Sequence, residues 1–78
     1  MTEQKIIKKF EELGYDWWHY KDKNVFELCK YDKTNGHLFF LGKIEIDLND
    51  KEYWSDISFT MQEHQLLTEL FKCYKWIE

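Results

Sequence analysis

The stretch that decides the fold is residues 37–59, HLFFLGKIEIDLNDKEYWSDISF. From residue 38 to residue 48 apolar side chains occupy the even positions except the glycine at 42, and charged side chains lie between the last three of them. Strict alternation is typical of a strand with one buried and one solvated face, because successive strand side chains point in opposite directions. The positions that this pattern assigns to the core are Leu38, Phe40, Ile44, Ile46 and Leu48.

A turn and a return strand are predicted directly after it. Residues 49–52 are expected to form the turn, because Asn and Asp side chains bond their own backbone and tolerate left-handed geometry. The return strand covers residues 53–59, and its core-facing side chains are Tyr53, Ile57 and Phe59. A register slip of one residue would expose the apolar set, so we expect a firm register.

Phe39 and Leu41 break the alternation, because they are apolar but occupy the odd, solvated positions. Gly42 follows them, and a glycine inside a strand often marks a β-bulge that changes the facing of the residues before it. Two interpretations stay open. Either Gly42 is a bulge and both side chains join the core, or both remain outside and form part of a binding surface.

Two further strands are predicted ahead of this hairpin. Residues 15–20, YDWWHY, form the first, residues 21–24 form a polar turn, and residues 25–31, VFELCKY, form the second. Trp17 and Trp18 are adjacent, so they must face opposite sides of an extended strand. A loop over residues 32–36 ends in Asn-Gly, which is a strong hairpin signal between strand-like runs.

Helices are predicted at both ends of the chain. Thr2 is a suitable N-cap for a helix over residues 2–13, and Gly14 is suited to the left-handed conformation that ends it. Thr60 and Glu63 match the capping box that begins a second helix. Trp76 lies off the apolar stripe of that helix, so it either folds back over a neighbouring strand or is exposed. The stripe contains Leu66, Leu67, Leu70, Cys73, Tyr74 and Ile77.

Together these elements predict a single small α+β domain over residues 1–78. The expected order is helix, four-stranded antiparallel meander sheet, helix, arranged in two layers. The chain contains no proline and three glycines, so long disordered linkers are not expected. Aromatic residues make up 19% of it, which suits a small core because each ring buries about 150–250 Å².

The charge of the chain argues against a nucleic-acid partner. The formal net charge is −4, and all eleven basic residues are lysine, so the arginine fork that best recognises phosphate is missing. Single-stranded nucleic acid could stack on Tyr31, Phe39 and Trp54, but the charges nearest to them in the sequence include carboxylates. Nucleic acid therefore ranks below a protein as the expected partner.

Cys29 and Cys73 are too few for the disulfide framework of a small secreted domain. The first residues are polar and show no apolar segment of a signal peptide. No apolar run approaches the roughly 20 residues of a membrane span. We therefore expect a cytoplasmic protein with free thiols and no membrane association.

No residue pattern points to catalysis. The His and Cys residues lack the close spacing of a zinc site, and the three glycines are isolated, so they cannot form a phosphate loop. Ser55 and Ser58 lie in a predicted strand, away from the strained turn that presents a nucleophile. We expect no enzyme activity, no metal site and no cofactor.

A candidate partner-binding surface follows from placing both helices on one side of the sheet. Exposed apolar clusters usually mark an interface, Trp and Tyr are enriched at binding hot spots, and an acidic rim would steer a basic partner. In the alternative arrangement the first helix covers this face, which gives three layers and no patch. The surface residues are Trp17 (or Trp18 in its place), Tyr31, Phe39, Leu41 and Trp54, with a rim of Asp47, Asp50, Glu52 and Asp56.

The lysine-only basic set, the small size, the many aromatic residues and the ending EHQLLTELFKCYKW resemble small accessory proteins of phages and mobile elements from low-GC Gram-positive bacteria. Such proteins often bind, and commonly block, a host protein. The resemblance implies a non-enzymatic protein-binding module, acting as an inhibitor or adaptor of a host protein. A homo-oligomerising structural protein, such as a homodimer, and a single-stranded nucleic-acid binder are the alternatives.

Overall fold

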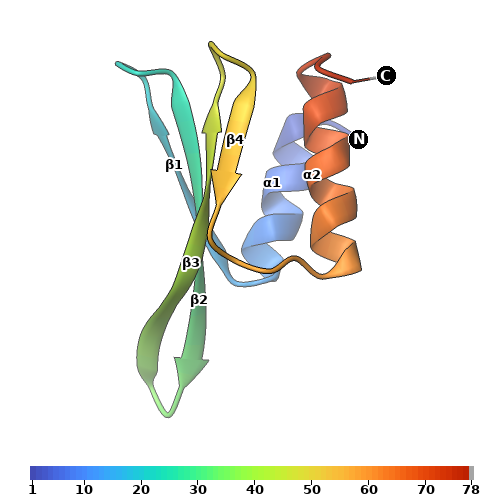
Figure 1. The fold of residues 1–78 in the computed structure, drawn as a ribbon. Helices are drawn as coiled ribbons and strands as arrows, with labels where there is room; N and C mark the ends of the chain where they lie inside the picture. Colours follow the sequence, from blue (N-terminus) through green and yellow to red (C-terminus); the bar gives the residue numbers. More distant parts are fainter. Residues whose placement is uncertain (78) are drawn as a thin grey trace.

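The computed structural model describes residues 1–77 and shows an α+β domain with a four-stranded antiparallel sheet (Figure 1). The strand order is β1-β2-β3-β4, so each strand pairs with its neighbours in sequence, as predicted. The elements are α1 (Glu3–Glu12), β1 (Tyr15–Tyr20), β2 (Val25–Thr34), β3 (His37–Asp47), β4 (Glu52–Ser55) and α2 (Met61–Cys73). Neither of the helices in the described part of the chain has the length and apolar character needed to cross a bilayer.

Both helices pack on the same side of the sheet, and the core lies between these two layers (Figure 1). This arrangement excludes the three-layer alternative in which α1 covers the other face. Each fully buried aliphatic or aromatic side chain stabilises the fold by about 1.5–3 kcal/mol. The core residues are Ile6, Ile7 and Phe10 of α1, Leu66, Leu67 and Leu70 of α2, and Tyr15, Phe26, Leu28, Ile44 and Ile46 of the sheet.

The predicted helix starts are confirmed. The hydroxyl of Thr2 accepts a hydrogen bond from the backbone N–H of Lys5 at 3.3 Å, and Gly14 after the helix has a φ of +98°. At the start of α2, the hydroxyl of Thr60 accepts from the Glu63 N–H at 3.1 Å, and the Glu63 carboxylate accepts from the Thr60 N–H at 2.9 Å. Both helices therefore begin where their side chains satisfy the first backbone N–H groups.

Helix α2 ends earlier than its apolar stripe predicts. Tyr74 is the C-cap and Lys75 adopts a φ of +62°, so the chain leaves the helix before Ile77, which is exposed. Trp76 folds back over its own helix instead of over a strand. Its ring stacks on Phe71 at 5.2 Å between centroids, and its backbone N–H donates to the Phe71 carbonyl at 2.9 Å.

The β2–β3 hairpin is longer than predicted. Asn35 and Gly36 have φ values of +53° and +80°, which is the type I′ pattern that joins two strands through two residues. Because this tight turn needs only these two residues, β2 continues to Thr34 and the predicted loop over residues 32–36 shrinks to the turn itself.

A β-bulge at Gly42 changes the facing of β3. Lys30 pairs with Gly42, but Tyr31 pairs with Phe40, so Leu41 has no partner on β2. The shift turns Phe40 to the same side of the sheet as Tyr31, away from the helices. The prediction that Phe40 and Leu38 lie in the core is therefore wrong, and both are more than half exposed.

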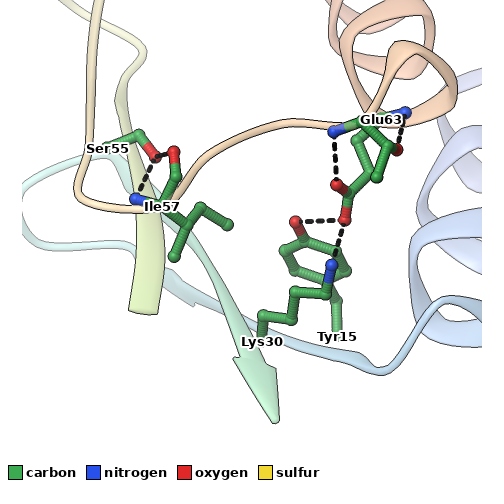
Figure 2. Close-up of polar contacts among 6 residues, drawn as sticks. Tyr15, Lys30, Ser55, Ile57 and Glu63 are labelled. Atoms are coloured by element: carbon green, nitrogen blue, oxygen red, sulfur yellow. Dashed lines mark hydrogen bonds and ion pairs between the residues drawn. The ribbon is translucent and has the colours of Figure 1, made fainter. Parts of the chain in front are cut away.

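Strand β4 ends at Ser55, four residues before the predicted end at Phe59. The Ser55 hydroxyl accepts from the Ile57 N–H at 3.2 Å (Figure 2), which turns the chain away from the ladder. The chain then passes over Gly42, where Ile57 occupies the space that a Cβ would need. Ile57 and Phe59 still pack against the core, as predicted, although they lie outside the strand.

The far end of the β2–β3 hairpin projects beyond the rest of the sheet and beyond the helices (Figure 1). Pairing with β1 stops at Lys30 of β2, and pairing with β4 starts only at Ile44 of β3. We call residues 31–41 the arm. Every residue from 32 to 41 is exposed, so the arm is a two-stranded ribbon open to solvent on both faces.

Candidate functional site

The side of the sheet that faces away from both helices is the candidate site, and we call it the outer face. Residues directly opposite one another on antiparallel strands share a face, so the register arranges these side chains in rows across the strands. The rows are Asp16, Cys29 and Lys43; Trp18, Glu27, Glu45 and Trp54; Tyr20, Val25, Asp47 and Glu52; and, on the arm, Tyr31 with Phe40 and Lys33 with Leu38.

Large aromatic side chains are exposed on the outer face. The exposed fractions are 63% for Trp18, 53% for Trp54 and 55% for Phe40. Phe40 is supported by the half-buried ring of Tyr31, which meets it edge-on with 5.7 Å between centroids. The two tryptophans belong to the two edge strands, β1 and β4, so they flank the sheet instead of forming one continuous patch.

A charged cluster occupies the space between the two tryptophans. The ammonium nitrogen of Lys43 lies 3.4 Å from the Glu27 carboxylate, 3.5 Å from the Glu45 carboxylate and 6.0 Å from the centre of the Trp54 ring. Attraction from Glu27, and then from Glu45, raises the pKa of Lys43, so this lysine stays charged. The outer face is acidic as a whole, with Asp16, Glu27, Glu45, Asp47 and Glu52 against Lys33 and Lys43.

Two of the predicted surface residues lie on the other side of the sheet. Trp17 pairs with the core residue Leu28 and stacks on Phe26 with 5.7 Å between ring centroids, so Trp18 is the tryptophan of β1 on the outer face. Phe39 pairs with Asp32 and therefore points to the opposite side of the arm from Phe40. Both Trp17 and Phe39 remain about half exposed.

The predicted acidic rim is only partly a surface feature. The Asp47 carboxylate accepts hydrogen bonds from the N–H groups of Asn49 and Asp50, each at 3.0 Å, so it holds the β3–β4 turn. The Asp56 carboxylate accepts from the Lys43 N–H at 2.8 Å, where the chain leaves β4. Asp50 and Glu52 are exposed, as a steering charge requires.

The arm carries the most unusual surface in the described chain. Four consecutive apolar residues, Leu38 to Leu41, are each more than half exposed. Monomers rarely leave such a run in solvent, because it attracts other apolar surfaces. The alternation pattern predicted Leu38 and Phe40 in the core, and it left Phe39 and Leu41 as candidates for a binding surface. Gly42 was the signal that the facing changes here.

A buried polar network joins α2 to the sheet, although the sequence predicted only the capping role of Glu63. The Glu63 carboxylate is 1% exposed and accepts from the Tyr15 hydroxyl and the Lys30 ammonium, both at 2.7 Å (Figure 2). Desolvation acts to raise the pKa of Glu63, but the hydrogen bonds from Lys30, Thr60 and Tyr15 outweigh it, so the pKa is lowered. Both carboxylate oxygens bind groups of the protein itself, which fits a structural clamp better than a reactive site.

The cysteines show no sign of a reactive site. Burial, followed by the hydrogen bond that the Cys29 thiol donates to Glu27 at 3.2 Å, raises the pKa of Cys29 to about 11. The thiol of Cys73 donates to the Met1 carbonyl at 3.1 Å. Among residues 1–77, no group of three or more His, Cys, Asp or Glu side chains is arranged to hold a metal ion.

Comparisons of the chain with protein-family models, with curated proteins and with solved structures found no match. The chemistry of the outer face and the arm is therefore the basis for a functional proposal.

Proposed function

We propose that this chain is a non-enzymatic protein-binding module that uses the outer face of its sheet. One observation carries the proposal: both helices cover one face, while Trp18, Phe40 and Trp54 stand more than half exposed on the other. Tryptophan and other aromatic side chains supply large rigid contact areas, and they are enriched among the residues that dominate binding energy.

The chemistry of the outer face favours a particular kind of partner surface. The tryptophans at the two edges require apolar pockets that accept an indole ring. The excess of carboxylates on the face, joined by Asp50 at the β3–β4 turn, favours lysine and arginine around those pockets. The same carboxylates would repel the phosphates of a nucleic acid, so a protein is the better fit.

The resemblance to small accessory proteins of phages and mobile elements extends this proposal to the nature of the partner. We propose that the partner is a host protein and that binding blocks it or recruits it. A stoichiometric blocker needs a rigid surface more than it needs a catalytic centre, and a sheet held by two helices is such a surface.

The test compares tryptophans that differ in the face they occupy. The tagged wild type captures its partner from a lysate of a low-GC Gram-positive host, and the affinity of the purified pair is then measured. We expect Trp18→Ala and Trp54→Ala each to weaken binding by at least tenfold, because each removes an anchor. Trp17→Ala and Tyr53→Ala are the matched controls, since both side chains lie on the helix side and are about half exposed.

The comparison is valid if the four variants keep the fold, which circular dichroism and thermal melting establish. Trp17 needs this check most, because its ring stacks on Phe26 of the core. Electrostatic steering adds a second expectation: association should slow as salt concentration rises. If all four variants bind the partner with the affinity of the wild type, the outer face is not the binding site.

A further inference from the structure

The outward edge of β3 in the arm is open for pairing. Strand β4 pairs with β3 only from Ile44 to Asp47, so the part of β3 from His37 to Leu41 has one neighbour, β2, among the described residues. Beyond Leu41 the edge is covered, because Asp56 binds the Lys43 N–H and Ile57 packs over Gly42. An uncovered strand edge presents unpaired N–H and C=O groups, which another strand can complete.

The two edges of the arm differ in charge. The β2 side carries Asp32 and Lys33, and charged side chains of this kind protect a strand edge from pairing. The β3 side carries no Asp, Glu, Lys or Arg from His37 to Leu41. The β3 edge is therefore the one that an added strand can approach without burying a charge.

The side chains of this edge are complementary to themselves. Leu38 to Leu41 are all apolar and all more than half exposed, so a second copy of the same edge offers apolar side chains to each of them. We propose that the arm pairs antiparallel with the arm of a second copy of this chain, β3 against β3, with the two-fold axis at Phe39. The axis keeps each side chain on its own face of the joined sheet, so Phe39 lies opposite Phe39 of the other copy, and Leu38 lies opposite Phe40.

This register satisfies the conditions for a symmetric contact. An antiparallel strand pair has a two-fold axis, which is the commonest symmetry of protein dimers. Each cross-strand pair from Leu38 to Phe40 joins two apolar side chains, and no like charges meet. The paired segment also ends at Leu41, where the chain after β4 begins to cover the edge.

The size of the contact predicts a weak dimer. Each of the four side chains is about half exposed, so at roughly 100 Å² apiece two copies offer on the order of 800 Å². Stable specific interfaces bury roughly 1,200–2,000 Å². We therefore expect monomer and dimer to exchange in a concentration-dependent way.

Sedimentation equilibrium of the purified chain tests the pairing. From low micromolar to near-millimolar concentration, the mean mass of the wild type should rise from one chain towards two. Phe39→Lys puts a charge on the open edge and should keep the protein monomeric. Met61→Lys, which adds the same charge at an exposed position of α2, should behave as the wild type. A wild type that stays monomeric throughout, or a Phe39→Lys variant that dimerises equally well, would overturn the proposal.

Cysteine cross-linking tests the register and does not depend on a charged variant. In a background of Cys29→Ser and Cys73→Ser, chains with Phe39→Cys and chains with Phe40→Cys are oxidised separately. The two copies of residue 39 lie directly opposite each other and close enough for a disulfide, whereas the two copies of residue 40 are offset along the strands. Phe39→Cys should therefore cross-link several-fold faster than Phe40→Cys. Equal rates for the two variants would contradict the proposed axis.

The self-pairing and the outer-face function can fail independently. Trp54→Ala removes an outer-face anchor on β4, away from the arm, so it should dimerise like the wild type. If the wild type is monomeric but still binds its partner through Trp18 and Trp54, only the self-pairing proposal is rejected. If the chain dimerises but its partner binding does not depend on either tryptophan, only the outer-face proposal is rejected.

Discussion

The side chain of Glu63 has two structural roles. One carboxylate oxygen caps α2 through the Thr60 N–H, and the other binds Tyr15 and Lys30 of the sheet. We expect Glu63→Gln to lower the free energy of unfolding at neutral pH by about 2–4 kcal/mol, because the partly buried Lys30 loses its counter-charge. Urea denaturation measures the change.

The exposed pair of Glu69 with Lys72, 3.6 Å apart, provides the control, and Glu69→Gln should cost less than about 1 kcal/mol. The pKa of Glu63 is lowered on folding, so its stabilisation is complete above the unfolded value of about 4.3 and is lost as pH falls through the lower folded value. Glu63→Gln should therefore show a shallower loss of stability in acid than the wild type. Equal costs for the two variants, or parallel acid profiles, would contradict the clamp.

Cys29 should be a slow nucleophile. Its pKa of about 11 leaves on the order of 100-fold less thiolate at neutral pH than an ordinary cysteine has. In a Cys73→Ser background, alkylation by iodoacetamide should be slow at neutral pH and should accelerate as pH rises towards 11. Modification at the rate of an unstructured cysteine peptide would show that the Cys29 thiol is neither buried nor bonded to Glu27.

At the scale of elements, the bulge at Gly42 shapes both the arm and the exit of β4. Its φ is +145°, and an added Cβ would overlap Ile57 and lie 2.7 Å from the Asp56 carboxylate. Gly42→Ala should therefore destabilise the fold by about 2–4 kcal/mol. Gly36→Ala is the matched control, because Gly36 also has a positive φ, +80°, but has no atom within 4 Å of the added Cβ.

Only the backbone strain should appear in Gly36→Ala, at a cost of about 1 kcal/mol. Thermal melting followed by circular dichroism separates the two variants. Equal melting temperatures would show that Ile57 does not need the space above Gly42.

Local patterns were sufficient to predict most elements. The caps at Thr2 and Thr60, the Asn35-Gly36 turn and the burial of Ile44 and Ile46 each depend on residues close in sequence. The two main errors arise at single residues. The alternation pattern of β3 was continued through Gly42, although the bulge there inserts one residue and reverses the facing of the residues before it. The hydrogen bond between Ser55 and Ile57 ends β4, but it leaves the hydrophobic pattern unchanged and so could not be seen in the sequence.

At the scale of the whole molecule, the extent of the layers decides which residues are exposed. Alternation shows that a strand has two faces, but it does not show how far the helices extend along that strand. The helices cover Ile44 and Ile46 but not Phe39, which points to the helix side of the arm and is still half exposed. The pair of Lys30 with Glu63, 33 residues apart, likewise leaves no pattern in the sequence.

The central claim is that both helices lie on one side and leave the outer face uncovered. The most direct measurement is NMR with a soluble paramagnetic reagent, at a concentration low enough to keep the chain monomeric. The indole signals of Trp18 and Trp54 should broaden strongly, while the methyl signals of Ile44 and Ile46, which face the helices, should be spared. If the indole signals of Trp18 and Trp54 are protected to the same degree as the methyl signals of Ile44 and Ile46, the claim is contradicted.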